Sequence, residues 1–451
     1  MSLVSLAEQV NPWWRDPTAR PPGLVPRRRA LQRTLMERLL REERRATVLR
    51  GPRQVGKTTL LKQCIADLLG AGWPAGNITY FDFSDERFAI GSSSPREVAD
   101  HAPGALDASR PRILLLDEVT RAASWTRWLK QAVDARAFRV LATDSSAAIL
   151  RESDVESGVG RWDSLELEGL TYREFLEIQA REGEDTSAVL RRLPDPFERY
   201  LTRGGFPEHA VEDRLLVAWS RLRDDISGKA IRKDLAAAKV DTERVNHVFQ
   251  YLVESSGSIV DARKIANALA SSFESAPDRR SLAKWLDLLE GTMLIRRLDR
   301  RVSNATSRLK SRASPRYYAA DHGLVMAFAA VPEPERDADV RARAFEALAY
   351  RHLREATRDK SVHIGFERDT RGSDEIDFVI EVAGDKSIAV EVKHSHSPRS
   401  GDVDGLRARA RKIGARRAVL LYGGVAREQR DGVELVPMHE FALDAERWLD
   451  R

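Results

Sequence analysis

An eight-residue segment with two glycines, Gly51-Pro52-Arg53-Gln54-Val55-Gly56-Lys57-Thr58, constrains the fold of this chain more than any other feature. The apolar run ATVLR precedes the segment, and an amphipathic pattern of helical period follows it from Thr59 to Leu69. Glycines let the main chain reverse, so that successive N–H groups point into one concavity. Because that concavity lies at the start of a helix, the helix dipole also favours an anion there. The segment therefore predicts a phosphate-binding loop between a strand and a helix.

Short apolar runs alternate with helical segments from Thr47 to about Ser146. The runs are ATVLR, NITYFDF, RILLLDE and FRVLATD. Strands that are apolar throughout and separated by helices are typical of a parallel sheet with both faces buried. The pattern predicts an α/β fold in which the phosphate loop belongs to a parallel-sheet domain.

The loop motif predicts a nucleotide and Mg²⁺ as its ligands. Lys57 would reach the β- and γ-phosphates, and the Thr58 hydroxyl would ligate Mg²⁺. The expected nucleotide-binding residues extend through the whole loop into the helix: Gly51, Pro52, Arg53, Gln54, Val55, Gly56, Lys57, Thr58 and Thr59.

Two acids follow the third apolar run, in Arg112-Ile113-Leu114-Leu115-Leu116-Asp117-Glu118. They fall at the carboxyl edge of a strand, where ligands bind in open α/β sheets. Asp117 would hold Mg²⁺ through its water shell, and Glu118 would orient and polarise the attacking water. The presence of Glu118 favours hydrolysis over nucleotide storage.

Two further polar residues are candidates with open alternatives. Asp144 ends the next strand and would lie beside the γ-phosphate as a sensor, although the polar segment that follows, including Ser145, is equally typical of a helix N-cap. Arg161, in Gly158-Val159-Gly160-Arg161, is either an arginine finger that supplies charge to the transition state or a surface residue.

A second constellation lies near the C-terminus, in Glu375-Ile376-Asp377-Phe378-Val379 and Ala389-Val390-Glu391-Val392-Lys393. Residues two apart on a strand face the same side, so Glu391 and Lys393 would project together. Asp377 on the adjacent strand would meet Glu391 across a divalent ion, because paired carboxylates repel without a cation. Lys393 would polarise a water or stabilise a pentavalent phosphate. The alternative is a solvated sheet with alternating charges.

Composition limits the classes of protein to which this chain can belong. The chain has 451 residues, and 74 Lys+Arg against 69 Asp+Glu give a net charge of +5, which permits nucleic acid as a partner without requiring it. The single cysteine, Cys64, excludes an internal disulfide and a multi-cysteine zinc site. No apolar run approaches the roughly 20 residues of a membrane span. The N-terminus lacks the pattern of a secretory signal, so we expect a cytoplasmic protein without a membrane partner.

Taken in order, several segments resemble the stand-alone AAA-type ATP-binding proteins of prokaryotes that carry a C-terminal domain of unknown function. The matching pieces are GPRQVGKTTL, LLLDEV followed by 125–129, GRWDSLELEGLTYREF, GGFPE at 204–208, RKDL at 232–235, YYAADHGL at 317–324, FE at 345–346, EIDFVI and AVEVK. The resemblance implies ATP as the nucleotide, a winged-helix segment and a C-terminal domain similar to the PD-(D/E)xK restriction-endonuclease fold. It also implies Glu346 as a third acid beside Asp377 and Glu391. The family often has glycine at the position of Asp144.

These observations predict five segments. They are an N-terminal tail at 1–29, a P-loop AAA-type ATPase domain at 30–170, a helical lid-like region at 171–240, a winged-helix-like region at 241–330 and a restriction-endonuclease-like domain at 331–451.

Three functions remain open from the sequence. The first is an AAA-type ATPase that couples nucleotide state to its C-terminal half, acting on nucleic acid. The second is a metal-dependent nuclease gated by the ATPase. The third is a nucleotide switch whose C-terminal domain is a non-catalytic scaffold for a protein partner. A homo-oligomer is expected if Arg161 acts on a neighbouring chain.

Overall fold

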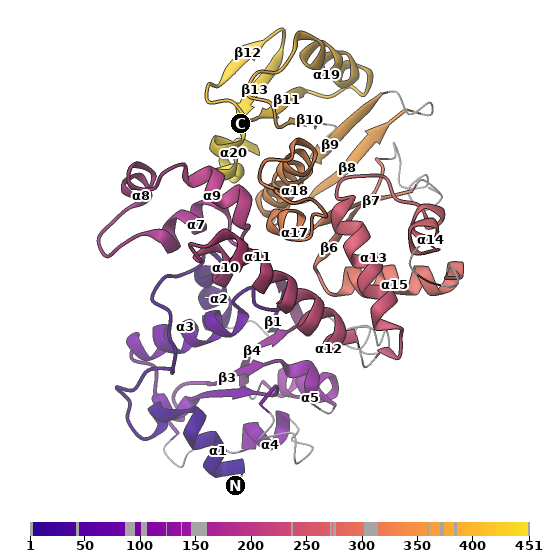
Figure 1. Cartoon of the computed structure of the whole chain (residues 1–451). Coiled ribbons are helices and arrows are strands. Elements are labelled where there is room, and N and C mark those ends of the chain that lie inside the picture. The colour runs from indigo at the N-terminus through magenta and orange to yellow at the C-terminus, as the bar shows by residue number, and fades with distance from the viewer. Residues whose placement is uncertain are drawn as a thin grey trace. The chain divides into compact units, whose positions relative to one another are not determined.

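The computed structural model of the chain forms two compact units, Met1–Glu168 and Gly169–Arg451 (Figure 1). Description is limited to residues 3–41, 45–85, 95–100, 106–122, 124–136, 138–145, 160–235, 238–270, 273, 277–301, 314–358, 360–369, 374–382 and 386–449. Ser146, Gly158 and Val159, which belong to segments discussed above, lie outside these ranges. The finer division of the chain into five segments stays a prediction.

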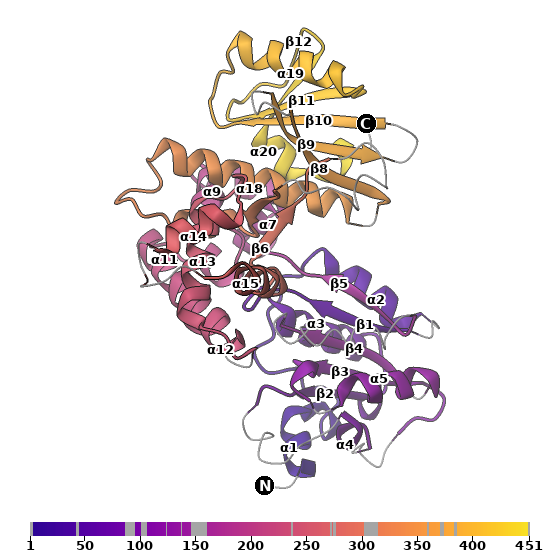
Figure 2. The same ribbon diagram turned by 90° about the vertical axis from the view of Figure 1, so that its right-hand side faces the viewer.

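The first unit is built on a five-stranded sheet in which every neighbouring pair is parallel, in the order β2-β3-β4-β1-β5 (Figure 2). The strands are β1 Ala46–Arg50, β2 Ile78–Asp82, β3 Arg112–Asp117, β4 Phe138–Asp144 and β5 Trp162–Glu166. The first four coincide with the predicted apolar runs, so the parallel sheet is confirmed. The fifth strand, WDSLE, was not anticipated because it has only one fully buried residue, Leu165, among polar neighbours.

Helices cover both faces of this sheet. They are α1 Leu3–Val10, α2 Leu31–Leu40, α3 Lys57–Gly70, α4 Pro95–Asp100 and α5 Trp125–Asp134, with short 3-10 turns η1 Pro12–Trp14, η2 Ala75–Asn77 and η3 Val119–Arg121. Leu60 of α3 and Leu35 of α2 pack in one apolar core, whereas Leu129 of α5 and Leu6 of α1 pack in the other. The chain before α2 packs on this unit, since the indole N–H of Trp13 donates to the carbonyl of Ile78 at 2.9 Å.

The second unit begins with helices and one small hairpin. The helices are α7 Tyr172–Gln179, α8 Thr186–Arg192, α9 Pro196–Arg203, α10 Pro207–Ala210, α11 Leu215–Arg223, the π-helical η5 Asp224–Ile231, α12 Arg232–Leu235, α13 Thr242–Glu254, α14 Ala262–Ala270 and α15 Arg279–Gly291. Strands β6 Ile295–Leu298 and β7 Arg316–Ala319 pair antiparallel. Residues 172–235 are therefore mostly helical, and residues 242–298 form three helices followed by a strand.

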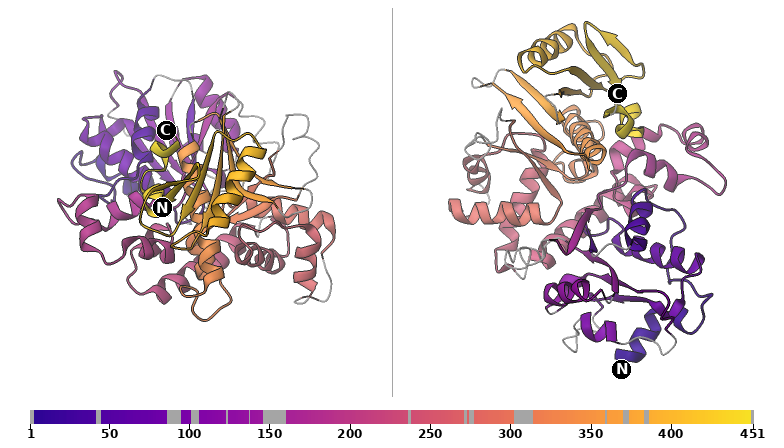
Figure 3. Two further views of the ribbon diagram at one scale, coloured as in Figure 1. Left: turned by 90° about the horizontal axis from the view of Figure 1, so that it is seen from above. Right: turned by 180° about the vertical axis from the view of Figure 1, so that it is seen from behind.

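A six-stranded sheet of order β12-β13-β11-β10-β9-β8 dominates the C-terminal part of this unit (Figure 3). Its strands are β8 Val362–Arg368, β9 Glu375–Val382, β10 Lys386–Lys393, β11 Arg417–Tyr422, β12 Glu428–Arg430 and β13 Val433–Pro437. The accompanying helices are α17 His322–Ala327, α18 Ala338–Thr357, α19 Ser400–Lys412, α20 Met438–Leu443 and α21 Ala445–Leu449. Strands β8, β9 and β10 are antiparallel, and β11 joins parallel to β10 after α19. The whole chain is therefore of mixed α/β class.

Within the described ranges, no helix is both long enough and apolar enough to cross a membrane.

A buried carboxylate fixes a tight junction between α9 and α17. Asp321 is 2% exposed and accepts hydrogen bonds from the N–H groups of Gly205 and Gly323, both at 2.8 Å. Gly204 stands beside it with φ +81° and ψ −171°, a conformation that other residues rarely adopt. A Cβ at this position would lie 2.1 Å from Asp321 Oδ1 and 2.7 Å from the Cα of Gly323.

We expect Gly204→Ala to lower the free energy of unfolding of the second unit by about 3 kcal/mol, because it adds backbone strain to a steric clash. Chemical denaturation measures the change. Gly401→Ala in α19 is the matched control, since a Cβ there meets nothing within 4 Å and should change stability by no more than about 1 kcal/mol. Equal effects of the two substitutions would contradict the described packing.

Candidate nucleotide site and C-terminal carboxylate cluster

The predicted phosphate loop joins β1 to α3 at the carboxyl edge of the first sheet. Gln54 has φ 62° and Gly56 has φ 103°, so the main chain reverses as the sequence predicts. Glycine adopts such a φ readily, whereas residues with a Cβ rarely do. A Cβ at Gly56 would meet nothing within 4 Å. The loop therefore leaves open space on the side of Gly56, at the start of α3, as an anion-binding turn requires.

Lys57 is the first residue of α3, and its ammonium lies over the loop. The residue is 5% exposed, and Nζ donates to the carbonyls of Gly51 at 2.9 Å and Pro52 at 3.0 Å. Burial lowers the pKa of Lys57, and the negative charges of Glu118 and Asp117 oppose this shift. The ammonium is thus held inside the loop within electrostatic reach of both predicted acids.

Asp117 lies at the end of β3 and contacts Thr58. Its carboxylate is 1% exposed and accepts hydrogen bonds from the hydroxyls of Thr143 and Tyr80, and the Thr58 hydroxyl lies close enough to lower its pKa. Burial raises the pKa of Asp117, and the bonds from Thr143 and Thr58 lower it. The two residues predicted to hold Mg²⁺ are therefore adjacent. Their hydroxyl and carboxylate oxygens fit the preference of Mg²⁺ for hard oxygen ligands, and a cation would favour the ionised form of the buried carboxyl.

Glu118 follows Asp117 in the left-handed region, with φ 51°. Its main-chain N–H donates to Thr143 Oγ1 at 2.9 Å, and its Oε2 accepts a hydrogen bond from the hydroxyl of Ser145. The carboxylate is only partly buried, so it is accessible to water while one oxygen is held in place. This geometry suits a group that orients a water molecule.

Asp144 is buried at the end of β4, and its contacts differ from those of Ser145. Asp144 accepts a hydrogen bond from the Thr120 hydroxyl at 2.9 Å and lies 4.0 Å from Nε of Arg50. Burial raises the pKa of Asp144. The neighbouring Ser145 contacts Glu118 instead. The sensor role of Asp144 stays a prediction.

Arg161 lies at the opposite edge of the sheet from the loop. It immediately precedes β5, where Trp162 pairs with Ala46 at the start of β1. The loop begins after Arg50, about 16 Å further along at about 3.3 Å per residue. Arg161 forms an ion pair with Asp134 at 3.2 Å. The structure therefore does not bring Arg161 to the nucleotide site of its own chain.

Several hydroxyl groups that orient the two acids were not predicted from the sequence. They are Tyr80 on β2, Thr143 on β4 and Ser145 after β4. Thr143 and Ser145 follow the apolar part of FRVLATD, at the same edge as the two acids, and that position was an available signal. Tyr80 lies inside an apolar run, and its position gave no such signal.

The C-terminal candidates also come together. Glu346 on α18, Asp377 on β9 and Glu391 on β10 form a group with Glu375, which we call the carboxylate cluster (Glu346, Glu375, Asp377 and Glu391). The predicted projection of Glu391 with Lys393 is confirmed, since Lys393 Nζ lies 2.9 Å from Glu391 Oε1. Asp377 Oδ2 accepts a hydrogen bond from the N–H of Val392 at 2.9 Å.

An unpredicted cation occupies this cluster. Arg316 on β7 lies 3.2 Å from Glu346 and 3.5 Å from Asp377, and it also forms an ion pair with Glu375. In the part of the chain that the structure describes, no three His, Cys, Asp or Glu side chains are grouped as metal ligands. The divalent ion predicted between Asp377 and Glu391 therefore does not fit the residues present.

Comparison with known families assigns part of this architecture. Residues 43–176 match the model of an AAA domain (AAA_14), residues 194–335 match a domain of unknown function (DUF8612), and residues 341–441 match another (DUF4143). The phosphate loop, Asp117 and Glu118 all fall in the first match. The N-terminal part of this chain thus contains an AAA domain, and its C-terminal part contains a domain of unknown function, as the resemblance implied.

No curated protein matches the chain in sequence. Among solved structures, the chain aligns with Cdc6p from Pyrobaculum aerophilum at 12% identity and a TM-score of 0.29, covering 76% of this chain and 98% of that one. The ORC2 protein of Aeropyrum pernix in its ADP form aligns at 14% identity and a TM-score of 0.32, with the same two coverages. DnaA from Aquifex aeolicus bound to AMPPCP aligns at 14% identity and a TM-score of 0.30, covering 59% and 89%. Similarity at this level does not establish a common fold for the whole chains.

Proposed function

We propose that this protein binds Mg²⁺-ATP, hydrolyses it, and couples its nucleotide state to its C-terminal half. The observation that carries the proposal is the meeting of the phosphate loop with an acidic pair. Lys57 and Thr58 start α3, Asp117 and Glu118 end β3, and Asp117 contacts Thr58 directly. The match of this segment to an AAA domain supports the same function.

Each residue has a separate task in this proposal. The N–H groups of the loop and the Lys57 ammonium bind and orient the phosphates. Thr58 and Asp117 hold Mg²⁺, which when bound neutralises negative charge on the phosphate oxygens. Glu118 orients the attacking water and accepts its proton, while Ser145 fixes the direction of the Glu118 carboxylate.

A hydrolysis assay of the purified wild-type chain tests the proposal. We expect release of phosphate from ATP in the presence of Mg²⁺ and its loss when EDTA removes the metal. A chain that releases no phosphate with Mg²⁺ present would contradict the proposed activity.

We propose that Arg161 acts on the nucleotide site of a neighbouring chain. Arg161 lies at the amino edge of the sheet, away from the loop of its own chain, so a role at a nucleotide site requires a second copy of the chain. An arginine supplied in trans is worth about 10³-fold or more in rate.

Mixing two inactive variants tests this role. Lys57→Ala keeps Arg161 but loses the site, whereas Arg161→Ala keeps the site but loses the arginine. If Arg161 acts in trans, each variant alone is inactive and the mixture regains hydrolysis, while Arg161→Ala still binds ATP. Arg191→Ala, an exposed arginine of α8, is the control and should retain full activity. No recovery, with activity per chain independent of concentration, would contradict a role in trans.

For the C-terminal half we propose a restriction-endonuclease-like fold used as a non-catalytic scaffold. The antiparallel strands β8, β9 and β10, followed by α19 and the parallel strand β11, support such a fold, with acids on β9 and β10 as the resemblance implies. A nuclease gated by the ATPase is the alternative. It needs a divalent ion in the carboxylate cluster, and we disfavour it because Arg316 already contacts three of the four acids.

We also propose that α15 binds nucleic acid as part of a winged-helix module formed by α13, α14, α15 and the β6–β7 hairpin. Arg279, Arg280 and Lys284 are exposed on α15, and such a row of cations is suited to phosphate contacts. The chain's small positive charge is compatible with this role.

Charge reversal on α15 tests the nucleic-acid contact. We expect Arg279→Glu/Arg280→Glu to weaken binding of duplex DNA or RNA at least tenfold, by fluorescence anisotropy. Because two phosphate contacts are lost, the slope of log K against log salt should fall by about 2. Arg191→Glu/Arg336→Glu makes the same charge change at other exposed sites and should bind as wild type. Equal weakening by both variants would exclude α15 as the contact.

A further inference from the structure

We propose that Arg316 is a resident cation of the carboxylate cluster and takes the position that a divalent metal would need. The cluster is thereby a closed, charge-balanced ion-pair centre that excludes Mg²⁺ and holds the β6–β7 hairpin to the C-terminal sheet. This inference does not depend on ATP binding or hydrolysis, because every residue in it belongs to the second unit.

The main chain fixes Arg316 from both sides. Arg316 begins β7, where it pairs with Leu298 of β6, and Ile259 forms a β-bridge with it on the other side. The flanking residues are held too, since Val260 N–H donates to Pro315 at 3.2 Å and Gly257 N–H donates to Tyr317 at 2.8 Å. The main chain of the fold therefore holds Arg316 at a fixed position.

The guanidinium itself is enclosed. The Arg316 side chain is 5% exposed, and its guanidinium carbon lies 4.9 Å from the centre of the Phe366 ring. Its Nη1 lies 3.2 Å from Glu346 Oε1 and 3.5 Å from Asp377 Oδ1, and it donates to the Tyr318 hydroxyl at 3.1 Å. That hydroxyl donates in turn to Glu346 Oε1 at 2.6 Å. One planar cation thus bridges acids from α18 and β9, which its several N–H donors permit.

The remaining charges of the cluster are balanced in the same manner. Glu391 is 9% exposed and contacts Lys393 at 2.9 Å and Arg409 at 3.4 Å. Glu375, besides its ion pair with Arg316, lies 3.6 Å from Arg368. Each of the four acids therefore contacts at least one of four cations. Burial, followed by the charge of Asp377, raises the pKa of Glu346 to about 8 and that of Glu391 to about 7. The charge of Arg316 beside Glu346 and that of Lys393 beside Glu391 lower these pKa values and so favour the ionised carboxylates.

A divalent ion would compete with Arg316 for the same oxygens. Mg²⁺ requires oxygen ligands at about 2.0–2.1 Å in near-octahedral geometry. The guanidinium contacts Glu346 and Asp377, and it stays charged at every physiological pH. A divalent ion bound to these oxygens would be repelled by the guanidinium charge, about twice as strongly as a monovalent ion at the same distance. The main chain cannot withdraw Arg316 without breaking its pairing with β6.

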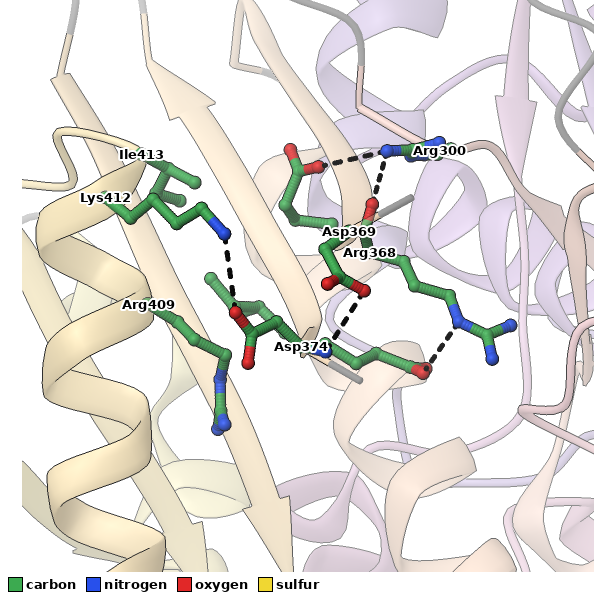
Figure 4. A pocket seen from close by; sticks show the side chains of 10 residues that line it. Arg300, Arg368, Asp369, Asp374, Arg409, Lys412 and Ile413 are labelled. Carbon is green, nitrogen blue, oxygen red and sulfur yellow. Dashed lines mark hydrogen bonds and ion pairs between the residues drawn. The ribbon is translucent and has the colours of Figure 1, made fainter. Parts of the chain in front are cut away.

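Solvent nevertheless reaches the edge of the cluster. Glu375 and Arg409 line a pocket together with Arg300, Arg368, Asp374 and Lys412 (Figure 4). Lys412 lies 3.3 Å from Asp374 across this pocket. A small ion therefore has a route to the carboxylates, and removal of the Arg316 charge should let one bind.

Manganese binding followed by electron paramagnetic resonance tests the proposal, in a Thr58→Ala background without nucleotide so that the first unit contributes no site. We expect Asp377→Asn to leave Mn²⁺ binding by this parent unchanged. Addition of Arg316→Met should create one Mn²⁺ site per chain, and further addition of Asp377→Asn should remove it. Arg300→Met, which deletes another cation of the pocket, is the control and should create no site.

Three outcomes would overturn the proposal. The first is that the parent binds Mn²⁺ and Asp377→Asn abolishes this binding. The second is that a folded Arg316→Met chain gains no Mn²⁺. The third is that the parent cleaves DNA or RNA and Asp377→Asn abolishes this cleavage. If Arg316→Met does not fold, the parent and its Asp377→Asn variant decide the question. Equal Mn²⁺ binding by these two chains supports a resident arginine, and unequal binding contradicts it.

Discussion

Replacement of Lys57 by alanine should abolish ATP hydrolysis and weaken nucleotide binding by about 100-fold or more. The Lys57 ammonium is enclosed by the carbonyls of Gly51 and Pro52 and lies at the start of α3, where the phosphates are expected. In other enzymes, removal of one hydrogen-bond donor that faces the charge developing in the transition state lowers the rate by about 10²–10³-fold. A phosphate-release assay and a nucleotide titration of the same preparation measure the two effects.

The matched control for this variant is Lys62→Ala. Lys62 lies on the same helix but donates to the carbonyl of Pro22 at 2.9 Å, outside the loop. It should keep wild-type hydrolysis. Both variants should retain the unfolding temperature of the wild type to within a few degrees, because the loss of the Lys57 hydrogen bonds is offset by relief of a buried charge. Wild-type turnover by Lys57→Ala would contradict the assignment of the loop.

The substitution Glu118→Gln should separate binding from hydrolysis. An amide has almost the shape of the carboxylate and can still accept the bond from Ser145, but it cannot take a proton from water. Loss of a general base lowers the rate by about 10²–10⁴-fold. We therefore expect hydrolysis to fall by at least about 100-fold while ATP affinity stays close to that of the wild type.

Glu37→Gln serves as the control for this second variant, because Glu37 is an exposed residue of α2 that pairs with Arg33. Its turnover should not change. A Glu118→Gln chain that hydrolyses ATP at the wild-type rate would remove Glu118 from the reaction. A chain that no longer binds ATP would show that Glu118 supports the fold of the site instead.

The candidate nucleotide site was largely predictable from the sequence because its residues follow local patterns. A glycine turn before a helix and an apolar strand that ends in two acids are each complete within a few residues, so Lys57, Thr58, Asp117 and Glu118 could be proposed for this site directly. The contact of Tyr80 could not be predicted, and that of Ser145 was indicated only by its position after FRVLATD, because both contacts depend on which strands become neighbours. In the order β2-β3-β4-β1-β5, β3 lies between β2 and β4, and that order brings both hydroxyls to the acidic pair.

The C-terminal half was predictable in its strands and less so in its chemistry. Strands β9, β10 and β11 each carry an apolar run of at least three residues. Strands β8 and β12 are short of buried residues and were not anticipated, and β13 was not anticipated either, although four of its five residues are buried. The meeting of Glu346 with Asp377 and Glu391 followed the resemblance. Arg316 was missed because it belongs to a hairpin that lies well before these acids in the sequence, and only the tertiary fold brings it among them.

The proposed function requires that the loop from Gly51 to Thr58 binds a triphosphate beside Asp117. Calorimetric titration of the intact wild-type chain with Mg²⁺-ATP tests it most directly. We predict saturable binding of one nucleotide per chain that Lys57→Ala removes. A properly folded wild-type chain that produces no binding heat at any concentration of ATP or ADP, over a range of temperatures, would contradict the claim.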